Sequence, residues 1–195
     1  MPEAKKQHPP HIPGLRCFEC GQIEPIRVSE TPEELKNISS SNCEKIPTEK
    51  LRDVSAVTLK NGETILPRLQ DGKDNCGQTA LSMLGYDKQE IETIIQGEER
   101  LSTHHVYLGL PKAKWIKEAQ PESTADVMLS LVKMKTGSNH WILDVLGRDD
   151  KRQVICPANG VLSAEEYFTQ RADAVLFEFA VPLRSQVGLQ MQRDA

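Results

Sequence analysis

Two apolar runs near the C-terminal end constrain the fold more than any other feature of the chain. HWILDVL starts at His140, RQVIC ends at Cys156, and the polar turn sequence GRDDK separates them. Two short strand-like runs joined by such a turn predict a β-hairpin with antiparallel strands. DAVLFEFAVPL, at 173–183, predicts another strand after a helix capped by Ser163. The C-terminal half should therefore form an antiparallel sheet.

The preceding part of the chain has mainly helical patterns. Helices are predicted at 76–84, at 87–101 with Asp87 as cap, and at 123–134 with Ser123 as cap. Short helices are predicted from Thr31 and after Pro47, and Asn61-Gly62 predicts a hairpin within 55–66. Helices followed by an antiparallel sheet define an α+β fold class.

The chain is expected to hold one main domain. Residues 1–30 are proline-rich without apolar periodicity and predict an extended arm, either disordered or metal-binding. Residues 31–182 should form the domain, and 183–195 a C-terminal tail.

Charge and apolar content exclude some classes of function. With 24 basic and 28 acidic residues among 195, the net charge is -4, so a nucleic-acid partner is not expected. No stretch approaches the ~20 apolar residues that cross a bilayer, and the N-terminus lacks the pattern of a signal peptide. Synthesis in the cytoplasm is expected, and export by a specialised secretion machine stays open. Five cysteines without a secretory signal do not predict a disulfide framework.

Cys76 is the candidate nucleophile. It follows the polar loop QDGKDN and opens a predicted helix, whose N-terminus stabilises a thiolate and lowers the thiol pKa. The N–H of Cys76 and the side chain of Gln70, six residues earlier, would donate to an oxyanion. Gly77 would leave room for a substrate backbone.

His140, at the start of a strand after TGSN, is the best candidate for the base that activates the thiol. His104 and His105 rank second, because their surroundings show no clear periodicity. The alternative is that Cys76 is a small buried residue and His140 a hydrogen-bonded strand residue.

DNCGQTALSMLG and NHWILDVLGRDDKRQVICPANGVLSAEEYF together resemble the papain-like cysteine peptidase superfamily over residues 60–182. They are most similar to the peptidase domains that remove leader peptides from bacteriocins, and the pattern is shared by papain-fold bacterial effectors and toxins. The resemblance implies a nucleophile helix packed on an antiparallel sheet that carries the histidine. It also implies a protein or peptide substrate, which is either cleaved at a peptide bond or deamidated at glutamine.

One position departs from the family's pattern. Where the family has the Asp or Asn that orients the histidine, this chain has Cys156, and a neutral thiol is a poor orienter. Asn159 is favoured instead, since a hairpin centred between Asp149 and Asp150 would set it opposite His140. Asp144 is a weaker choice, and a Cys-His dyad or a domain that has lost activity are further alternatives.

The expected reaction is acyl transfer. His140 takes the proton of Cys76, the thiolate attacks a carbonyl, and Gln70 with the Cys76 N–H holds the oxyanion until water releases the acyl-enzyme. This reaction requires no metal and no cofactor.

A zinc-bearing binding module is the rival interpretation. Cys17 and Cys20 are half of a zinc site, which His8, His11 or Cys43 would complete. In that case the papain-like part would be a catalytically degenerate scaffold.

Overall fold

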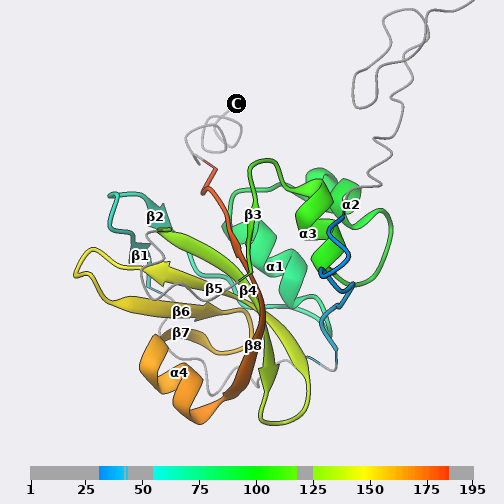
Figure 1. Cartoon of the computed structure of the whole chain (residues 1–195). Helices are drawn as coiled ribbons and strands as arrows, with labels where there is room; N and C mark the ends of the chain where they lie inside the picture. Colours follow the sequence, from blue (N-terminus) through cyan, green and yellow to red (C-terminus); the bar gives the residue numbers. More distant parts are fainter. Residues whose placement is uncertain (1–30, 42, 44–54, 118–124, 185–195) are drawn as a thin grey trace, which may run out of the picture. The chain divides into compact units, whose positions relative to one another are not determined.

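A computed structural model describes residues 31–41, 43, 55–117 and 125–184 (Figure 1). The chain divides into two compact units between Pro32 and Glu33, and all that follows concerns the second unit. In chain order its elements are β1 (Val57–Thr58), β2 (Thr64–Ile65), α1 (Cys76–Met83), α2 (Lys88–Ile95), α3 (Thr103–Gly109), β3 (Lys114–Ile116), β4 (Val127–Met134), β5 (Asn139–Leu146), β6 (Arg152–Cys156), β7 (Gly160–Ser163), α4 (Ala164–Gln170) and β8 (Ala172–Ala180). The predicted α+β class is therefore confirmed.

An antiparallel sheet of six strands, in the order β3-β8-β4-β5-β6-β7, forms the centre of the fold. The predicted β5–β6 hairpin is present, but its register differs from the expected one. Leu146 pairs with Arg152, which centres the hairpin on Asp149 rather than between Asp149 and Asp150. A shift of one residue in the register changes which side chains face one another across the hairpin.

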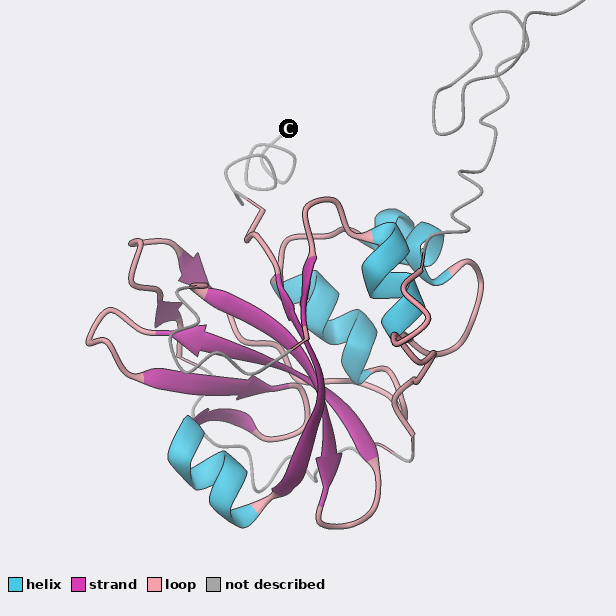
Figure 2. Cartoon of the chain, viewed as in Figure 1, coloured by secondary structure: helices cyan, strands magenta, loops and turns pink. Residues whose placement is uncertain are grey.

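The side chains of β5 alternate between two cores, as the pleat of a strand requires. Trp141, Leu143 and Val145 pack in the larger core, to which α1, α2 and α3 contribute. Ile142 packs in the smaller core, with residues of β6, β7 and α4. Figure 2 shows α1–α3 grouped on one side and α4 apart from them.

Local capping explains where α2, α3 and α4 begin. Asp87 and Glu90 form a capping box at α2, and Ser163 caps α4 by accepting a hydrogen bond from the Glu166 N–H, so both predicted starts are confirmed. Ser102 and His105 form an equivalent box at α3, which was not predicted. Gly85, which directly follows the C-cap of α1, has φ +93°, a conformation that glycine adopts without strain.

Two predicted helices were wrong, one is shorter than predicted, and one lies outside the described residues. The helix predicted at 87–101 ends at Ile95, because Gln96 and Gly97 both have positive φ. The helix predicted at 123–134 is instead β4, because a strand between β8 and β5 is buried on both faces and loses the alternation that marks a strand. The helix predicted from Thr31 is a turn followed by extended backbone, since a single turn has too few hydrogen bonds to be stable alone. The helix expected after Pro47 falls among residues 44–54, which are not described.

None of the helices in the described ranges has the length and apolar character needed to cross a membrane.

Candidate functional site

Cys76 is the first residue of α1, as the sequence predicts. The N-cap residue, Asn75, makes no side-chain capping bond, so the helix N-terminus keeps its positive end for the thiol of Cys76. The backbone N–H of Trp141 points to Cys76 Sγ at 3.5 Å, which adds a second donor favouring a thiolate. Cys76 is 0% exposed, so this thiol is fully covered.

His140 lies at the start of β5 and comes close to Cys76, as predicted. The Sγ atoms of Cys43 and Cys76 and a ring nitrogen of His140 all lie within 4.8 Å of one another. Cys43 Sγ is 3.4 Å from Cys76 Sγ and 3.0 Å from His140 Nδ1. Cys43 and His140 are 2% and 3% exposed, so the whole group is buried.

The second ring nitrogen of His140 contacts Cys156, not Asn159. Cys156 Sγ lies 3.2 Å from His140 Nε2. Cys156 pairs with Gly160 at the end of β6, and it packs with Ile142 on the face of the sheet that His140 shares by period two. This thiol therefore occupies the place where an orienting Asp or Asn was expected.

Asn159 contacts Cys156 rather than His140. Its Nδ2 donates to Cys156 Sγ at 3.1 Å, and its Oδ1 accepts a hydrogen bond from the Arg171 guanidinium at 2.9 Å. The expected direct contact of Asn159 with His140 is not the arrangement observed, because the hairpin register differs from the one on which that prediction depended. Asn159 instead positions the thiol that contacts the imidazole.

The electrostatics favour a charged imidazole between sulfur atoms. Burial opposes ionisation of both groups, but the Cys43 thiol and the His140 ring hold the pKa of Cys76 well below its usual value. Burial likewise opposes charge on His140, yet Cys156 and Cys76 raise its pKa well above the usual value. An imidazolium alone can donate from both ring nitrogens, and here sulfur atoms lie on both sides of the ring.

The remaining cysteines differ in their acidity. The hydrogen bond to Cys76, together with burial, raises the pKa of Cys43, so Cys43 is the protonated partner of the thiol pair. Burial raises the pKa of Cys156, but His140 and Asn159 outweigh that effect and lower it. Of the thiols in contact with His140, Cys76 is the one placed at a helix N-terminus.

Gln70 is buried near the site but is engaged with backbone carbonyls. Its Nε2 donates to Gly72 O at 3.0 Å and lies 3.5 Å from Cys43 O, while its Oε1 has no hydrogen-bond partner among the described residues. Its backbone N–H donates to Pro157 O at 2.8 Å, which joins the loop before α1 to the turn after β6. The Gln70 side-chain amide, which was predicted to donate to an oxyanion, thus faces the backbone carbonyl of Cys43.

Residues 38–41 and Cys43, here termed the covering segment, pair with backbone groups on both sides of the site. Thr103 N donates to Ile38 O on the helical side, and Ser39 bridges to Ser102. On the sheet side, Ser41 and Asn139 exchange backbone hydrogen bonds of 3.0 and 3.2 Å. The blue trace beside α3 in Figure 1 is residues 31–41, and residues 38–41 of the covering segment form its end.

The end of the covering segment is held by Asp74. The Cys43 N–H donates to Asp74 Oδ1 at 2.8 Å, and Asp74 N–H donates to Cys43 O at 3.1 Å. The other carboxylate oxygen of Asp74 pairs with Arg100 at 2.8 Å. Extended backbone paired on both sides is the way that a bound peptide lies in a groove.

The other candidate residues have separate roles. His104 Nε2 contacts Leu35 O at 2.9 Å, and His105 belongs to the capping box of α3. Asp144 pairs with Arg152 at 2.9 Å, so it does not orient His140. His8, His11, Cys17 and Cys20 lie outside the described residues.

Gly77 does not leave an open space. A Cβ at this position would lie 2.4 Å from Leu101 Cβ and 3.0 Å from Trp141 Cδ1. Glycine is therefore needed for close packing of α1 against its neighbours, a requirement that the sequence around Cys76 does not reveal.

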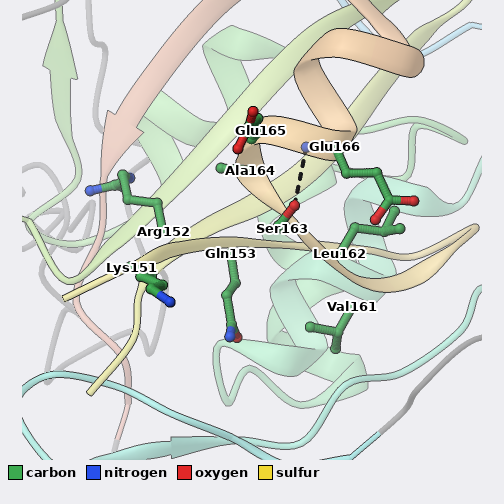
Figure 3. A pocket seen from close by; sticks show the side chains of 9 residues that line it. All are labelled: Lys151, Arg152, Gln153, Val161, Leu162, Ser163, Ala164, Glu165 and Glu166. Carbon is green, nitrogen blue, oxygen red and sulfur yellow. Dashed lines mark hydrogen bonds between the residues drawn. The ribbon is translucent and has the colours of Figure 1, made fainter. Parts of the chain in front are cut away.

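A surface pocket of about 590 Å³ lies elsewhere, between β6, β7 and the start of α4 (Figure 3). Lys151, Gln153 and Glu165 are among its lining residues, and none of the residues that contact His140 lines it. The pocket is distinct from the buried cysteine-histidine group.

Sequence reasoning did not find Cys43 as a member of this group. It is 33 residues from Cys76 and 97 from His140, and no local pattern links them. Comparisons with models of known protein families, with curated proteins and with solved structures found no match.

Proposed function

We propose that this chain is a papain-like cysteine hydrolase of protein or peptide substrates, with Cys76 as nucleophile and His140 as base. The observation that carries the proposal is the arrangement of Cys76, His140 and Cys156. The Cys76 thiol, at a helix N-terminus, lies close to the His140 imidazole, and the other ring nitrogen of His140 contacts Cys156 Sγ. Nucleophile, base and orienting group are the parts that covalent acyl transfer requires. The resemblance of residues 60–182 to papain-like peptidases, effectors and toxins supports the same class.

In the proposed reaction, His140 holds the proton of Cys76, and the thiolate sulfur forms a bond to the substrate carbonyl carbon. The Cys76 N–H stabilises the oxyanion, and Gln70 Nε2 is the second donor once it is released from Cys43 O. His140 then gives its proton to the leaving nitrogen, which departs as an amine or as ammonia. Water, deprotonated by His140, hydrolyses the thioester and restores the thiol.

Cys156 is the proposed positioning residue for His140. Its sulfur accepts from Asn159 Nδ2, and Arg171 holds Asn159 in turn, so these two side chains fix the thiol beside His140 Nε2. This series of contacts takes the place of a single Asp or Asn. A neutral sulfur is a weak acceptor, and we expect slower turnover than an orienting carboxylate would give.

The substrate requires the covering segment to leave. Cys76 is fully buried, and Cys43 of the segment lies 3.4 Å from its sulfur. The backbone groups of Asn139 and Ser102 that the segment occupies are the ones available to an extended peptide. An unfolded or extended region of a target protein would take the place of the segment. Peptide-bond cleavage and glutamine deamidation differ only in the carbonyl presented to the thiolate.

The test is incubation of the full chain with a mixture of denatured proteins, followed by mass spectrometry. New N-termini would identify a peptidase, and ammonia release with conversion of glutamine to glutamate would identify a deamidase. Cys76→Ala is the matched control and should abolish either product. Equal product from the native chain and Cys76→Ala would contradict the proposal.

A catalytically degenerate binding module is the second candidate, favoured by the closure of the cleft and by Cys156 at the orienting position. It predicts that Cys76 stays unreactive toward iodoacetamide even when the covering segment is displaced. In the hydrolase, displacement should expose a thiol that reacts below pH 8.

A further inference from the structure

We infer that Cys43, Cys76 and His140 form a binding site for a zinc ion, which fixes the covering segment over the nucleophile. The two sulfurs are 3.4 Å apart, Cys43 Sγ is 3.0 Å from His140 Nδ1, and all three donor atoms lie within 4.8 Å of one another. Donors of a tetrahedral zinc site with bonds of about 2.0–2.3 Å are roughly 3.5–3.8 Å apart. Small outward shifts of these donors would therefore accommodate the ion.

The chemistry of the donors selects zinc over harder cations. Two thiolates and one imidazole suit Zn²⁺, whereas Mg²⁺ and Ca²⁺ require oxygen ligands. The nearby carboxylate of Asp74 is already bonded to Cys43 N–H and to Arg100. Three protein donors leave one position of a tetrahedral ion for water.

Groups around the donors already support such a site. A ligating histidine usually has its other ring nitrogen held by a neighbour, and Cys156 Sγ lies 3.2 Å from His140 Nε2. The Trp141 N–H points to Cys76 Sγ at 3.5 Å and would stabilise its thiolate. Burial of all three ligands keeps the donor atoms away from bulk solvent.

The ligands come from three separate parts of the chain, so the ion would join them. Cys43 belongs to the covering segment, Cys76 to α1 and His140 to β5. Zinc requires a neutral imidazole with a free lone pair, whereas the hydrolase requires a protonated one beside the thiolate. The same three side chains would therefore have two mutually exclusive states, metal-bound and catalytic.

The consequence for activity rests on the proposed function, while metal binding itself does not. A coordinated Cys76 sulfur cannot attack a carbonyl, and the ion would also hold the covering segment in the cleft. Loss of zinc would free the Cys76 sulfur and the covering segment. Binding to the closed state alone would shift the population toward closure as zinc rises.

The test is metal analysis of the reduced full chain after equilibration with zinc and removal of unbound ion. We expect one zinc per chain, and with cobalt the absorption bands of thiolate-to-metal charge transfer. Cys43→Ser should lose at least tenfold in affinity, because it removes one thiolate. The matched control is Cys17→Ser with Cys20→Ser, which should bind zinc like the native chain.

Absence of zinc from the reduced native chain would overturn the inference. So would zinc that is retained in Cys43→Ser but lost in the Cys17→Ser, Cys20→Ser control. Each variant should first show native circular dichroism, and Cys43→Ala, which removes the donor without adding a hydroxyl, provides a second test.

A further measurement separates this inference from the proposed function. Stoichiometric zinc should slow alkylation of Cys76 at least tenfold, with recovery on chelation. Zinc binding without hydrolysis by the chelated protein would keep the metal site and refute the hydrolase. A reactive, hydrolytic protein that binds no zinc would refute the metal site alone.

Discussion

Replacement of Ser41 by proline should open the cleft. The Ser41 N–H donates to Asn139 O at 3.0 Å, and proline has no N–H. This bond is one of a reciprocal pair that joins the covering segment to the start of β5, next to His140. Its loss should weaken the segment's hold on the sheet while leaving the side chains of the proposed nucleophile and base unchanged.

The size of the effect follows from the hydrogen bond that is lost. A backbone hydrogen bond contributes about 1 kcal/mol net, and an acceptor left unpaired in a partly buried position costs about 1 kcal/mol more. A change of about 2 kcal/mol raises the open population roughly 30-fold, since 1.4 kcal/mol corresponds to a factor of ten. The substitution acts on opening of the segment, so the global free energy of unfolding should change by no more than that amount.

Alkylation of Cys76 by iodoacetamide, followed by mass spectrometry in the presence of a chelator, reports the open population. Where opening is fast relative to reaction, the rate is proportional to that population. Ser41→Ala is the matched control, because it keeps the backbone N–H and removes only the hydroxyl. We expect roughly 30-fold faster alkylation in Ser41→Pro and a change of less than about threefold in Ser41→Ala.

Equal rates in Ser41→Pro and Ser41→Ala would refute the argument that backbone pairing with Asn139 closes the cleft. Faster reaction of the core thiol Cys156 along with Cys76 would show general unfolding instead, and would refute it as well.

Three other predictions follow from the site and its packing. In Ser41→Pro, the pH midpoint of Cys76 alkylation should lie below the usual thiol pKa of about 8.5. Adding His140→Ala should move this midpoint upward, because burial then acts without the opposing imidazolium, and pH-rate profiles of both proteins check this. Cys156→Ala should lower kcat roughly tenfold or more with little change in KM, whereas Cys156→Asn should retain activity, as kinetics with any substrate found in the screen would show. Gly77→Ala should lower the free energy of unfolding by about 1–3 kcal/mol in urea titrations, because its Cβ would meet Leu101 at 2.4 Å, while Gly72→Ala, whose nearest contact is 3.5 Å, should not.

The parts of the fold with strong local signals were predictable from sequence. The Asn61-Gly62 turn, the Asp87 and Ser163 caps and the β5–β6 hairpin depend on residues close together in the chain. β4 was mistaken for a helix because its burial depends on β5 and β8, which flank it only in the folded sheet. Hydrophobic periodicity does not distinguish such a run from a buried helix.

The candidate site was predictable to a similar extent. Cys76 at a helix start and His140 at a strand start are local features, and both lie where they were expected. The contact of Cys156 with His140 depended on a register that sequence did not define to one residue, which placed Asn159 wrongly. Cys43 had no signal, since its contacts come from backbone pairing of the covering segment with distant residues.

The long sequence separations within the site have a consequence for folding. Cys43 and His140 are 97 residues apart, so their contact requires closure of a long loop, which is slow relative to formation of α1 or the β5–β6 hairpin. We therefore expect the sheet and α1 to assemble first, leaving Cys76 accessible until the covering segment docks. For that interval during synthesis or refolding, the thiol would be open to solvent, oxidants and foreign peptides.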